Sequence, residues 1–384
     1  MKKLIRLGFG LLALPILLHA QQPKVIHMIL TSDVHFGIFK KKFRGDTTVP
    51  SWKINQAAIA QMNKLPDMKL PHDKGVAAGQ LIGDIDRLVI TGDIANREEP
   101  PYQCATISWQ QFVDTYGSQL HTAANKQEPQ LLLVPGNHDV SNAIGYTKKM
   151  EPATDPTSLV NIYNLTMHPP VPLTNTNYNY ANNKVNYSKE IGGAHCIFLT
   201  IWPDSAERIW IAKDLESVSA QTPVILFTHD PPEGDPKHFS NPAAPGKFVK
   251  DSKFENMVAE TYKEGPAPQK DGDHTTDIEQ RGWVNFLKRH PNIKAYFHGH
   301  ENWNEFYTYK GPDKDINLPV FRIDSPMKGE DSAKDETKLS FQLISLDPVK
   351  KMLTVRQCLW NTHPGRKDQE IKFGESKTIS LAIL

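Results

Sequence analysis

The hydrophobic pattern of the chain consists of short apolar runs that are separated by mixed polar segments. The runs are rich in Val, Ile, Leu and Phe and have the length of β-strands, and continuous runs such as 130–134 and 224–228 are typical of strands buried on both faces. The pattern predicts strands over residues 25–31, 87–91, 130–134, 195–201, 224–228, 293–297, 320–323, 339–346 and 352–357.

Helical patterns fall between several of these strands. Apolar residues recur at helical spacing over residues 52–65, 106–120, 206–218 and 276–289, and Asp204 or Ser205 can cap the third helix. Strands that alternate with helices and then give way to a strand-rich end indicate an α/β sandwich in which helices cover sheets.

Three stretches read as long loops or insertions. Residues 142–189 are rich in Asn, Tyr, Pro and Thr, residues 231–275 are rich in Pro, Gly, Lys and Asp, and residues 329–338 form a shorter charged stretch. Loops of the first two lengths in a compact domain are usually functional or disordered. No change in composition marks a boundary, so residues 24–384 are predicted to form one domain decorated by these loops.

The first twenty residues have the features of an export signal. Lys2, Lys3 and Arg6 precede an apolar run over residues 7–18, and Ala20 offers a small residue for cleavage. The apolar run is shorter than the roughly 20 residues of a spanning helix. We therefore expect a signal peptide over residues 1–20, a periplasmic or secreted protein, and no stable membrane span after cleavage; an uncleaved anchor is the alternative.

Charge and cysteine content exclude some functions. The net charge of the chain is +1, and removal of Lys2, Lys3 and Arg6 with the leader makes it −2. A nearly neutral chain has no overall basic field to hold a long nucleic acid. Three scattered cysteines are too few for a disulfide scaffold or a thiolate metal site.

Polar residues that can bind metals follow five of the predicted strands. In α/β sheets, ligand and catalytic groups gather at the carboxyl ends of strands, so these side chains are expected to converge in one crevice. In chain order they are Asp33 and His35, then Asp93, then Asn137 and His138, then His229, and last His300 and Asn302.

These residue types fit two metal ions. Imidazole suits zinc, iron and similar ions, whereas carboxylate and amide oxygens suit harder ones. A carboxylate can bridge two ions, and a pair of ions about 3.5–4 Å apart can clamp a phosphate and activate water. Phosphoryl transfer depends more on such charge neutralisation than on a covalent nucleophile.

The order D-x-H, GD, GNHD, H and GH resembles that of the calcineurin-like metallophosphoesterases, which include purple acid phosphatases and class III cyclic nucleotide phosphodiesterases. The resemblance covers about residues 26–303. It implies a four-layer α-β-β-α sandwich with a dinuclear metal centre. Carried over to this chain, it makes Asp33 and His35 ligands of the first ion, Asp93 the bridge, and Asn137, His229 and His300 ligands of the second.

The resemblance also assigns chemistry. His138 matches a histidine that is not a metal ligand and that protonates the leaving group or stabilises its charge. The attacking group would be a metal-bound hydroxide. Asp139 and Asn96 are candidates to orient His138, and Asp230 is expected to lie behind the ligands.

One motif departs from the family. Its last motif is usually Gly-His-x-His, but this chain has Gly299-His300-Glu301-Asn302, so Asn302 stands where a first-ion histidine is expected. The first site could then be weaker, different in metal preference, or lost. In a second register His298 and His300 form the histidine pair; we favour the first, because it leaves Gly299 at the turn.

Taken together, the sequence predicts an exported metal-dependent phosphoric ester hydrolase. It would act on a small phosphomonoester or phosphodiester with two divalent or trivalent ions, Mn, Fe or Zn. The alternatives are a non-catalytic or single-metal binding protein on the same fold, and a metal-dependent nuclease or cyclic nucleotide phosphodiesterase. No Asp-Arg-Gly follows Gly92-Asp93, which argues against a protein phosphatase.

Overall fold

The computed structural model of the chain describes residues 24–85, 87–95, 103–121, 130–140, 156–239, 257–260, 277–366 and 369–383. The predicted signal peptide and Asn96 lie outside these ranges. Within them, no helix combines the length and apolar composition needed to cross a membrane.

Two six-stranded mixed sheets form the centre of the described structure. The first has the order β14-β13-β12-β1-β4-β5, and the second has the order β10-β11-β9-β8-β7-β6. The first sheet consists of β1 (Ile26–Thr31), β4 (Arg87–Ile90), β5 (Gln130–Leu133), β12 (Ser340–Asp347), β13 (Met352–Leu359) and β14 (Lys372–Ser380). The second consists of β6 (Tyr187–Ile191), β7 (Ala194–Phe198), β8 (Val224–Phe227), β9 (Ile293–His298), β10 (Glu305–Tyr309) and β11 (Leu318–Arg322).

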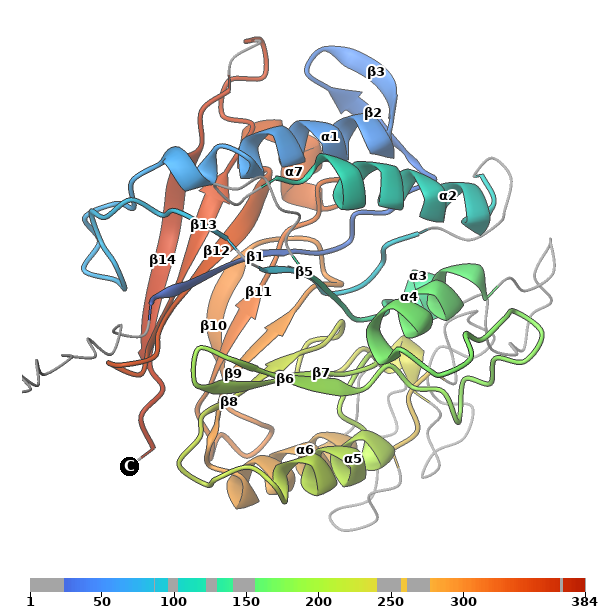
Figure 1. Cartoon of the computed structure of the whole chain (residues 1–384), viewed down its shortest axis with the longest axis vertical. Helices are drawn as coiled ribbons and strands as arrows, with labels where there is room; N and C mark the ends of the chain where they lie inside the picture. The colour runs from blue at the N-terminus through green and yellow to red at the C-terminus, as the bar shows by residue number, and fades with distance from the viewer. Residues whose placement is uncertain are drawn as a thin grey trace, which may run out of the picture.

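Helices cover the outer face of each sheet. Figure 1 shows α1 and α2 outside the first sheet and α5 and α6 outside the second, so the layers follow the order α-β-β-α. This confirms the predicted α/β four-layer sandwich. The helices are α1 (Ser51–Met62), α2 (Ala105–Phe112), α3 (Asn137–Val140), α4 (Thr157–Met167), α5 (Ser205–Leu215), α6 (Asp277–Arg289) and α7 (Glu330–Lys334), and a hairpin of β2 (Phe39–Phe43) and β3 (Asp46–Pro50) precedes α1.

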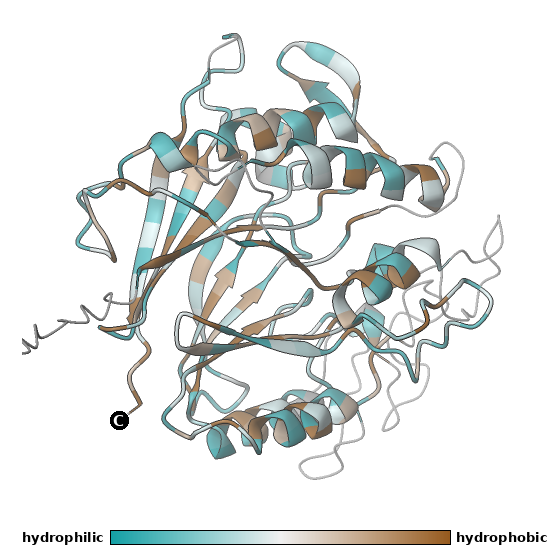
Figure 2. Cartoon of the chain, in the orientation of Figure 1, coloured by the Kyte–Doolittle hydropathy of each residue, from teal (hydrophilic) through white to brown (hydrophobic). Residues whose placement is uncertain are grey.

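Buried apolar side chains join the two sheets in one core. In Figure 2 the hydrophobic colour follows the central strands, whereas the helices carry both colours. A row of stacked rings crosses the second sheet, with centroids 4.7 to 4.9 Å apart from one strand to the next. The row consists of Tyr187, Phe198, Phe227, Phe297 and Phe321. The Tyr187 hydroxyl donates to the carbonyl of Leu133 in the first sheet at 3.0 Å, which links the two layers.

The structure adds elements to the predicted list and moves some boundaries. Each of the nine predicted strands has a counterpart, but β2, β3, β6, β10 and β14 were not predicted. The helix predicted over residues 206–218 is α5. It begins at Ser205 with Asp204 as its cap, because the Asp204 carboxylate accepts from the amides of Ala206 and Glu207. The second helix ends at Phe112 and continues as a π-helical turn over Val113–Gly117.

Parts of the predicted loops are ordered. Within 142–189, the described residues include α4 and the start of β6. Leu159 and Ile162 attach α4 to the core, since both side chains are buried there. Within 231–275, Pro236–His238 forms a 3₁₀ turn. The charged stretch 329–338 contains α7.

Candidate metal centre

The predicted site residues converge where the two sheets meet. Strands β1, β4 and β5 are parallel neighbours in the first sheet, and β8 and β9 are parallel neighbours in the second. Their carboxyl ends therefore lie together within each sheet. The amide of His300, after β9, donates to Asp33 Oδ2, after β1, at 2.9 Å. This hydrogen bond ties the loops of the two sheets to each other.

The loops that carry the site adopt unusual backbone conformations. Five predicted site residues have positive φ in the left-handed region, which non-glycine residues rarely adopt and which concentrates at functional sites. They are Asp33 (52°), His35 (44°), Asp93 (53°), His300 (69°) and Asn302 (62°). Gly299 lets the loops approach each other, since a Cβ there would collide with Ser32 Oγ and Asp33 Oδ2.

Asp93 belongs to two groups of side chains that could each hold a metal ion. One group is His35, Asp93 and His138, and the other is Asp33, Asp93 and His229. Asp93 Oδ2 lies 3.6 Å from His35 Nε2, and Asp93 Oδ1 lies 3.5 Å from His229 Nε2. Each carboxylate oxygen thus faces a different imidazole, as a bridging ligand requires.

A second set of donors surrounds Asn137 at the start of α3. The Asn137 Oδ1 atom lies 3.0 Å from His229 Nε2 and 3.2 Å from His300 Nδ1. The two imidazole nitrogens are themselves 3.2 Å apart. One amide oxygen and two imidazole nitrogens therefore point at one place, and a metal ion prefers such a set of donors.

Neighbouring acceptors fix which nitrogen of each ring faces this place. His229 Nδ1 lies 2.7 Å from the carbonyl oxygen of Thr91, and His300 Nε2 lies 2.7 Å from Asp235 Oδ2. Both partners only accept, so these nitrogens carry the hydrogens. In the neutral rings, the form that binds a metal ion, the lone pairs of His229 Nε2 and His300 Nδ1 face Asn137, and such partners are typical of metal-binding histidines.

Burial and mutual charge shift the acidity of the site. Burial raises the pKa of Asp93 to about 7, and the nearby carboxylate of Asp33 adds to the rise. Burial would also raise the pKa of Asp33, but the rings of His35 and His229 hold it well below its usual value. Burial disfavours the charged form of His229, yet the carboxylates around it raise its pKa to about 9. Carboxylates crowded in this way gain from a bound cation.

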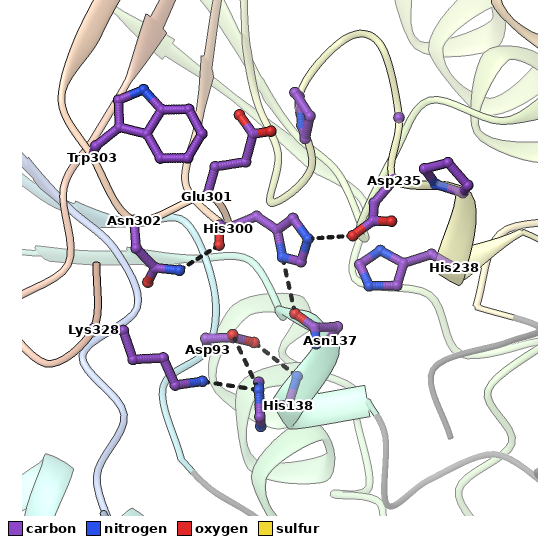
Figure 3. Close-up of a pocket in the computed structure, with 13 residues that line it drawn as sticks. Asp93, Asn137, His138, Asp235, His238, His300, Glu301, Asn302, Trp303 and Lys328 are labelled. Carbon is purple, nitrogen blue, oxygen red and sulfur yellow. Dashed lines mark hydrogen bonds and ion pairs between the residues drawn. The ribbon is translucent and has the colours of Figure 1, made fainter. Parts of the chain in front are cut away.

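A cavity of about 470 Å³ opens over the centre. His138 forms part of its wall, with Nε2 4.0 Å from Asp93 Oδ2 and 3.1 Å from the ammonium nitrogen of Lys328. Figure 3 shows Asp93, Asn137, His138 and His300 converging at the floor of the cavity and Trp303 at its edge. Most of the residues that line the cavity are polar, and the cavity is open to solvent.

Asp139 stabilises the loops and does not act as a simple partner for His138. Its carboxylate accepts from the amides of Ile94, Ala95 and Gly136 and from the Ser158 hydroxyl, at 2.5 to 3.2 Å. These bonds hold the loops after β4 and β5 together. Asn96, the other candidate for orienting His138, lies outside the described residues.

Of the two candidates for the last ligand of the first ion, Asn302 lines the cavity and His298 does not. Asn302 lines the cavity; its Nδ2 donates to the carbonyl of His300 at 2.7 Å, and its buried Oδ1 accepts no hydrogen bond within the described residues. His298 is buried beside Tyr307, with Nε2 3.3 Å from the Tyr307 hydroxyl. In the first register of the last motif, Asn302 therefore offers an oxygen ligand at the cavity. The second register would need the ring of His298, which packs elsewhere.

Three residues of the site were absent from the prediction. Asp235 and His238 lie in the predicted loop 231–275, and Lys328 follows β11. Asp235, His238 and His300 form a third group that could hold a metal ion, and His238 Nδ1 lies 2.7 Å from Asp230 Oδ2. Asp230 also forms a group with His229 and His300 that could hold a metal ion, so its expected place behind the ligands stays a prediction. The ends of strands were the signal used in the prediction, and Lys328 lies six residues beyond the end of β11, too far for that signal to find it.

The family follows from this fold and this donor set. The family model described as calcineurin-like phosphoesterase matches residues 26–313, and the chain belongs to this family. Its buried groups of His and Asp are of the kind that holds two metal ions. No curated protein sequence matches the chain significantly.

Comparison with solved structures finds matches at low sequence identity. A dimetal phosphatase from Danio rerio is 10% identical, with a TM-score of 0.50, over 93% of this chain and 99% of that one. A phosphopantetheinyl hydrolase from Mycobacterium tuberculosis is 13% identical over 78% of this chain and 89% of that one, with a TM-score of 0.33. Vps29 from Chaetomium thermophilum is 10% identical over 93% and 98%, with a TM-score of 0.31.

Proposed function

We propose that the chain is an exported metal-dependent phosphoesterase that hydrolyses a small phosphomonoester or phosphodiester. The observation that supports this most is the position of Asp93, whose two carboxylate oxygens face two different imidazole rings, those of His35 and His229. A donor set of this kind serves two ions that share one carboxylate.

The residues present fit such ions. Asp33 Oδ1 and Asn302 Oδ1 are buried oxygens that accept no hydrogen bond within the described residues, and such atoms are costly unless a cation or water binds them. Asp33, His35 and Asp93 would hold the first ion, with Asn302 as the candidate fourth ligand. Asp93, Asn137, His229 and His300 would hold the second. Mn, Fe and Zn all suit these ligands.

When bound, the ions would supply positive charge for the phosphoryl group and lower the pKa of water. The chain supplies the rest. Thr91 and Asp235 orient the rings of His229 and His300. His138 lies on the cavity wall, where its ring, once protonated at Nε2, can give that proton to the oxygen of the leaving group. A cavity of about 470 Å³ is large enough for a small ester.

Metal content and turnover test this proposal together. The purified chain, reconstituted with Mn, Fe or Zn, should bind two ions and hydrolyse p-nitrophenyl phosphate or its bis-ester. Asp93→Asn should lose both metal affinity and turnover, whereas the matched control Asp214→Asn, at a separate pair with His195, should change neither.

Two results would contradict parts of the proposal. A folded chain that binds two ions and hydrolyses neither ester would be a binding protein and not an enzyme. A single bound ion would show that the first site no longer binds metal with Asn302 in the place of a histidine. Export has its own test: mass spectrometry of the exported protein should find Gln21 as the first residue.

A further inference from the structure

Lys328 brings a positive charge into the cavity. Among the described residues that line it, Lys328 is the only lysine or arginine, whereas Asp93, Asp235 and Glu301 contribute carboxyl groups. Figure 3 shows the Lys328 side chain extended toward His138. Its ammonium nitrogen lies 3.1 Å from His138 Nε2, and its charge counteracts the rise in the pKa of Asp93.

Hydrogen bonds fix the backbone of Lys328 to the loop that carries Asp33. The Ser325 hydroxyl donates to the carbonyl of Asp33 at 2.7 Å. The oxygen of the Ser325 hydroxyl also accepts from the amides of Met327 at 3.1 Å and Lys328 at 3.0 Å. The Ser332 hydroxyl donates to the carbonyl of Lys328 at 2.8 Å. The start of the lysine side chain is therefore held at a fixed place beside the candidate first ion.

Gly329 fixes the same segment to the second sheet. Its φ is +106°, and a Cβ there would collide with the backbone oxygen of Asn302. The turn at 328–329 thus lies directly against the loop that follows β9. Lys328 is held from both sides, and only its flexible four-carbon stem is left to adjust to a ligand.

We propose that Lys328 is a catalytic residue whose ammonium group donates a hydrogen bond to a non-bridging phosphoryl oxygen of the substrate. This inference rests on the proposed phosphoesterase function. In the free protein the ammonium group donates to His138 Nε2. An anionic ester draws the ammonium group to its phosphoryl oxygen, and His138 Nε2 then faces the leaving oxygen.

The charge balance of the cavity favours this role. Asp235 and Glu301 line the cavity, so a protein cation beside the reacting atoms offsets their repulsion of an anionic phosphate ester. Lysine binds phosphate as a compact point charge and does not require the paired geometry of arginine.

Neutral variants of Lys328 test the proposal on the metal-loaded chain. Lys328→Met and Lys328→Gln should bind the same number of ions as the wild type but bind inorganic phosphate about tenfold or more weakly. Their kcat/KM should fall roughly a hundredfold, equally for esters with good and poor leaving groups. Lys328→Arg should recover part of both losses. The control Lys334→Met, on the exposed side of α7, should behave like the wild type.

The outcomes separate this inference from the proposed function. Unchanged phosphate affinity in both neutral variants would overturn it. A loss confined to esters with poor leaving groups would also overturn it, because Lys328 would then act only through His138. If Lys328→Met weakens phosphate binding while the metal-loaded wild type hydrolyses no ester, the contact between Lys328 and phosphate stands, but its catalytic role falls with the proposed function.

Discussion

At the scale of residues, the imidazole rings of the centre differ in what holds them. His229 and His300 each give one N–H to a fixed acceptor, Thr91 and Asp235, and turn the other nitrogen toward Asn137. His138 instead has a donor, the ammonium group of Lys328, at its Nε2. The first arrangement prepares a metal ligand, and the second prepares a group that exchanges a proton or a hydrogen bond.

His138→Ala separates the proton-donor role from the metal-ligand role. We expect the variant to keep its metal content and to lose turnover by roughly 10²–10⁴-fold for esters with poor leaving groups such as alkyl phosphates. Esters with a nitrophenol leaving group, which departs without a proton, should be affected far less. Metal analysis and rates on both ester types check this. Loss of a metal ion would mean that His138 is a ligand.

Asp235→Asn tests the partner of His300. The carboxylate of Asp235 lies 2.7 Å from His300 Nε2, and removal of such a partner typically weakens metal binding about 10–100-fold. We expect this loss for one ion of the two, measured by competition with a chelator. An amide can also donate to Nε2 and favour the wrong tautomer. Equal affinity in the variant and the wild type would show that Asp235 only fills space.

The sequence could predict residues whose position follows from a strand end. All eight predicted residues, from Asp33 to Asn302, lie around one centre because parallel strands place their carboxyl ends together. Asp235 and His238 could not be predicted in this way, since they lie in a loop whose path depends on tertiary contacts. The tautomer of His300 was unpredictable for the same reason. The metal-binding and catalytic roles themselves stay predictions until metal content and rates are measured.

At the scale of elements, the hydrophobic pattern predicted the central strands and the edge strand β5, but it missed the edge strands β6, β10 and β14. β14 alternates exposed and half-buried positions along nearly its whole length, and β10 is a short edge strand next to β11. Edge strands bury one face at most, so their apolar signal is weak. Helix α4 was hidden in an Asn-rich stretch, although its buried side has Leu159 and Ile162 at helical spacing.

β1 also contains a buried titratable group that is remote from the centre. The His27 ring lies between β1 and β12, with Nδ1 3.0 Å from Ser345 Oγ. Burial, with the positive charges of Arg356 and Lys24, lowers the pKa of His27 from 6.5 to about 4. The ring is therefore neutral in the folded chain at pH values where the unfolded chain becomes protonated.

This shift predicts a loss of stability in acid. As pH falls from about 6.5 to about 4, the unfolded chain binds a proton that the folded chain does not, so the free energy of unfolding should fall by up to about 3 kcal/mol. Below about pH 4 the effect saturates. Urea unfolding of the wild type and of His27→Asn, at pH 7 and at pH 4.5, isolates this contribution. A difference between the two proteins that does not vary with pH would contradict the prediction.

At the scale of the whole molecule, the centre lies on the seam between the two sheets. Ligand residues come from β1, β4 and β5 on one side and from β8 and β9 on the other. The bond from Tyr187 to Leu133 and the shared hydrophobic core join the same two layers elsewhere. Metal binding should therefore stabilise both sheets at once, because neither sheet holds a full set of ligands.

Calorimetry tests this coupling together with the prediction of a single domain over residues 24–384. The chain without metal should unfold in one transition. Ligands that bind only the folded state stabilise it by about 2.7 kcal/mol at 100 times Kd, so added Zn or Mn should raise the Tm of that one transition and a chelator should reverse the rise. Asp93→Asn, which lacks the shared carboxylate, serves as the control and should show little rise. Two transitions, of which metal shifts only one, would show that the sheets unfold separately and that the one-domain prediction is wrong.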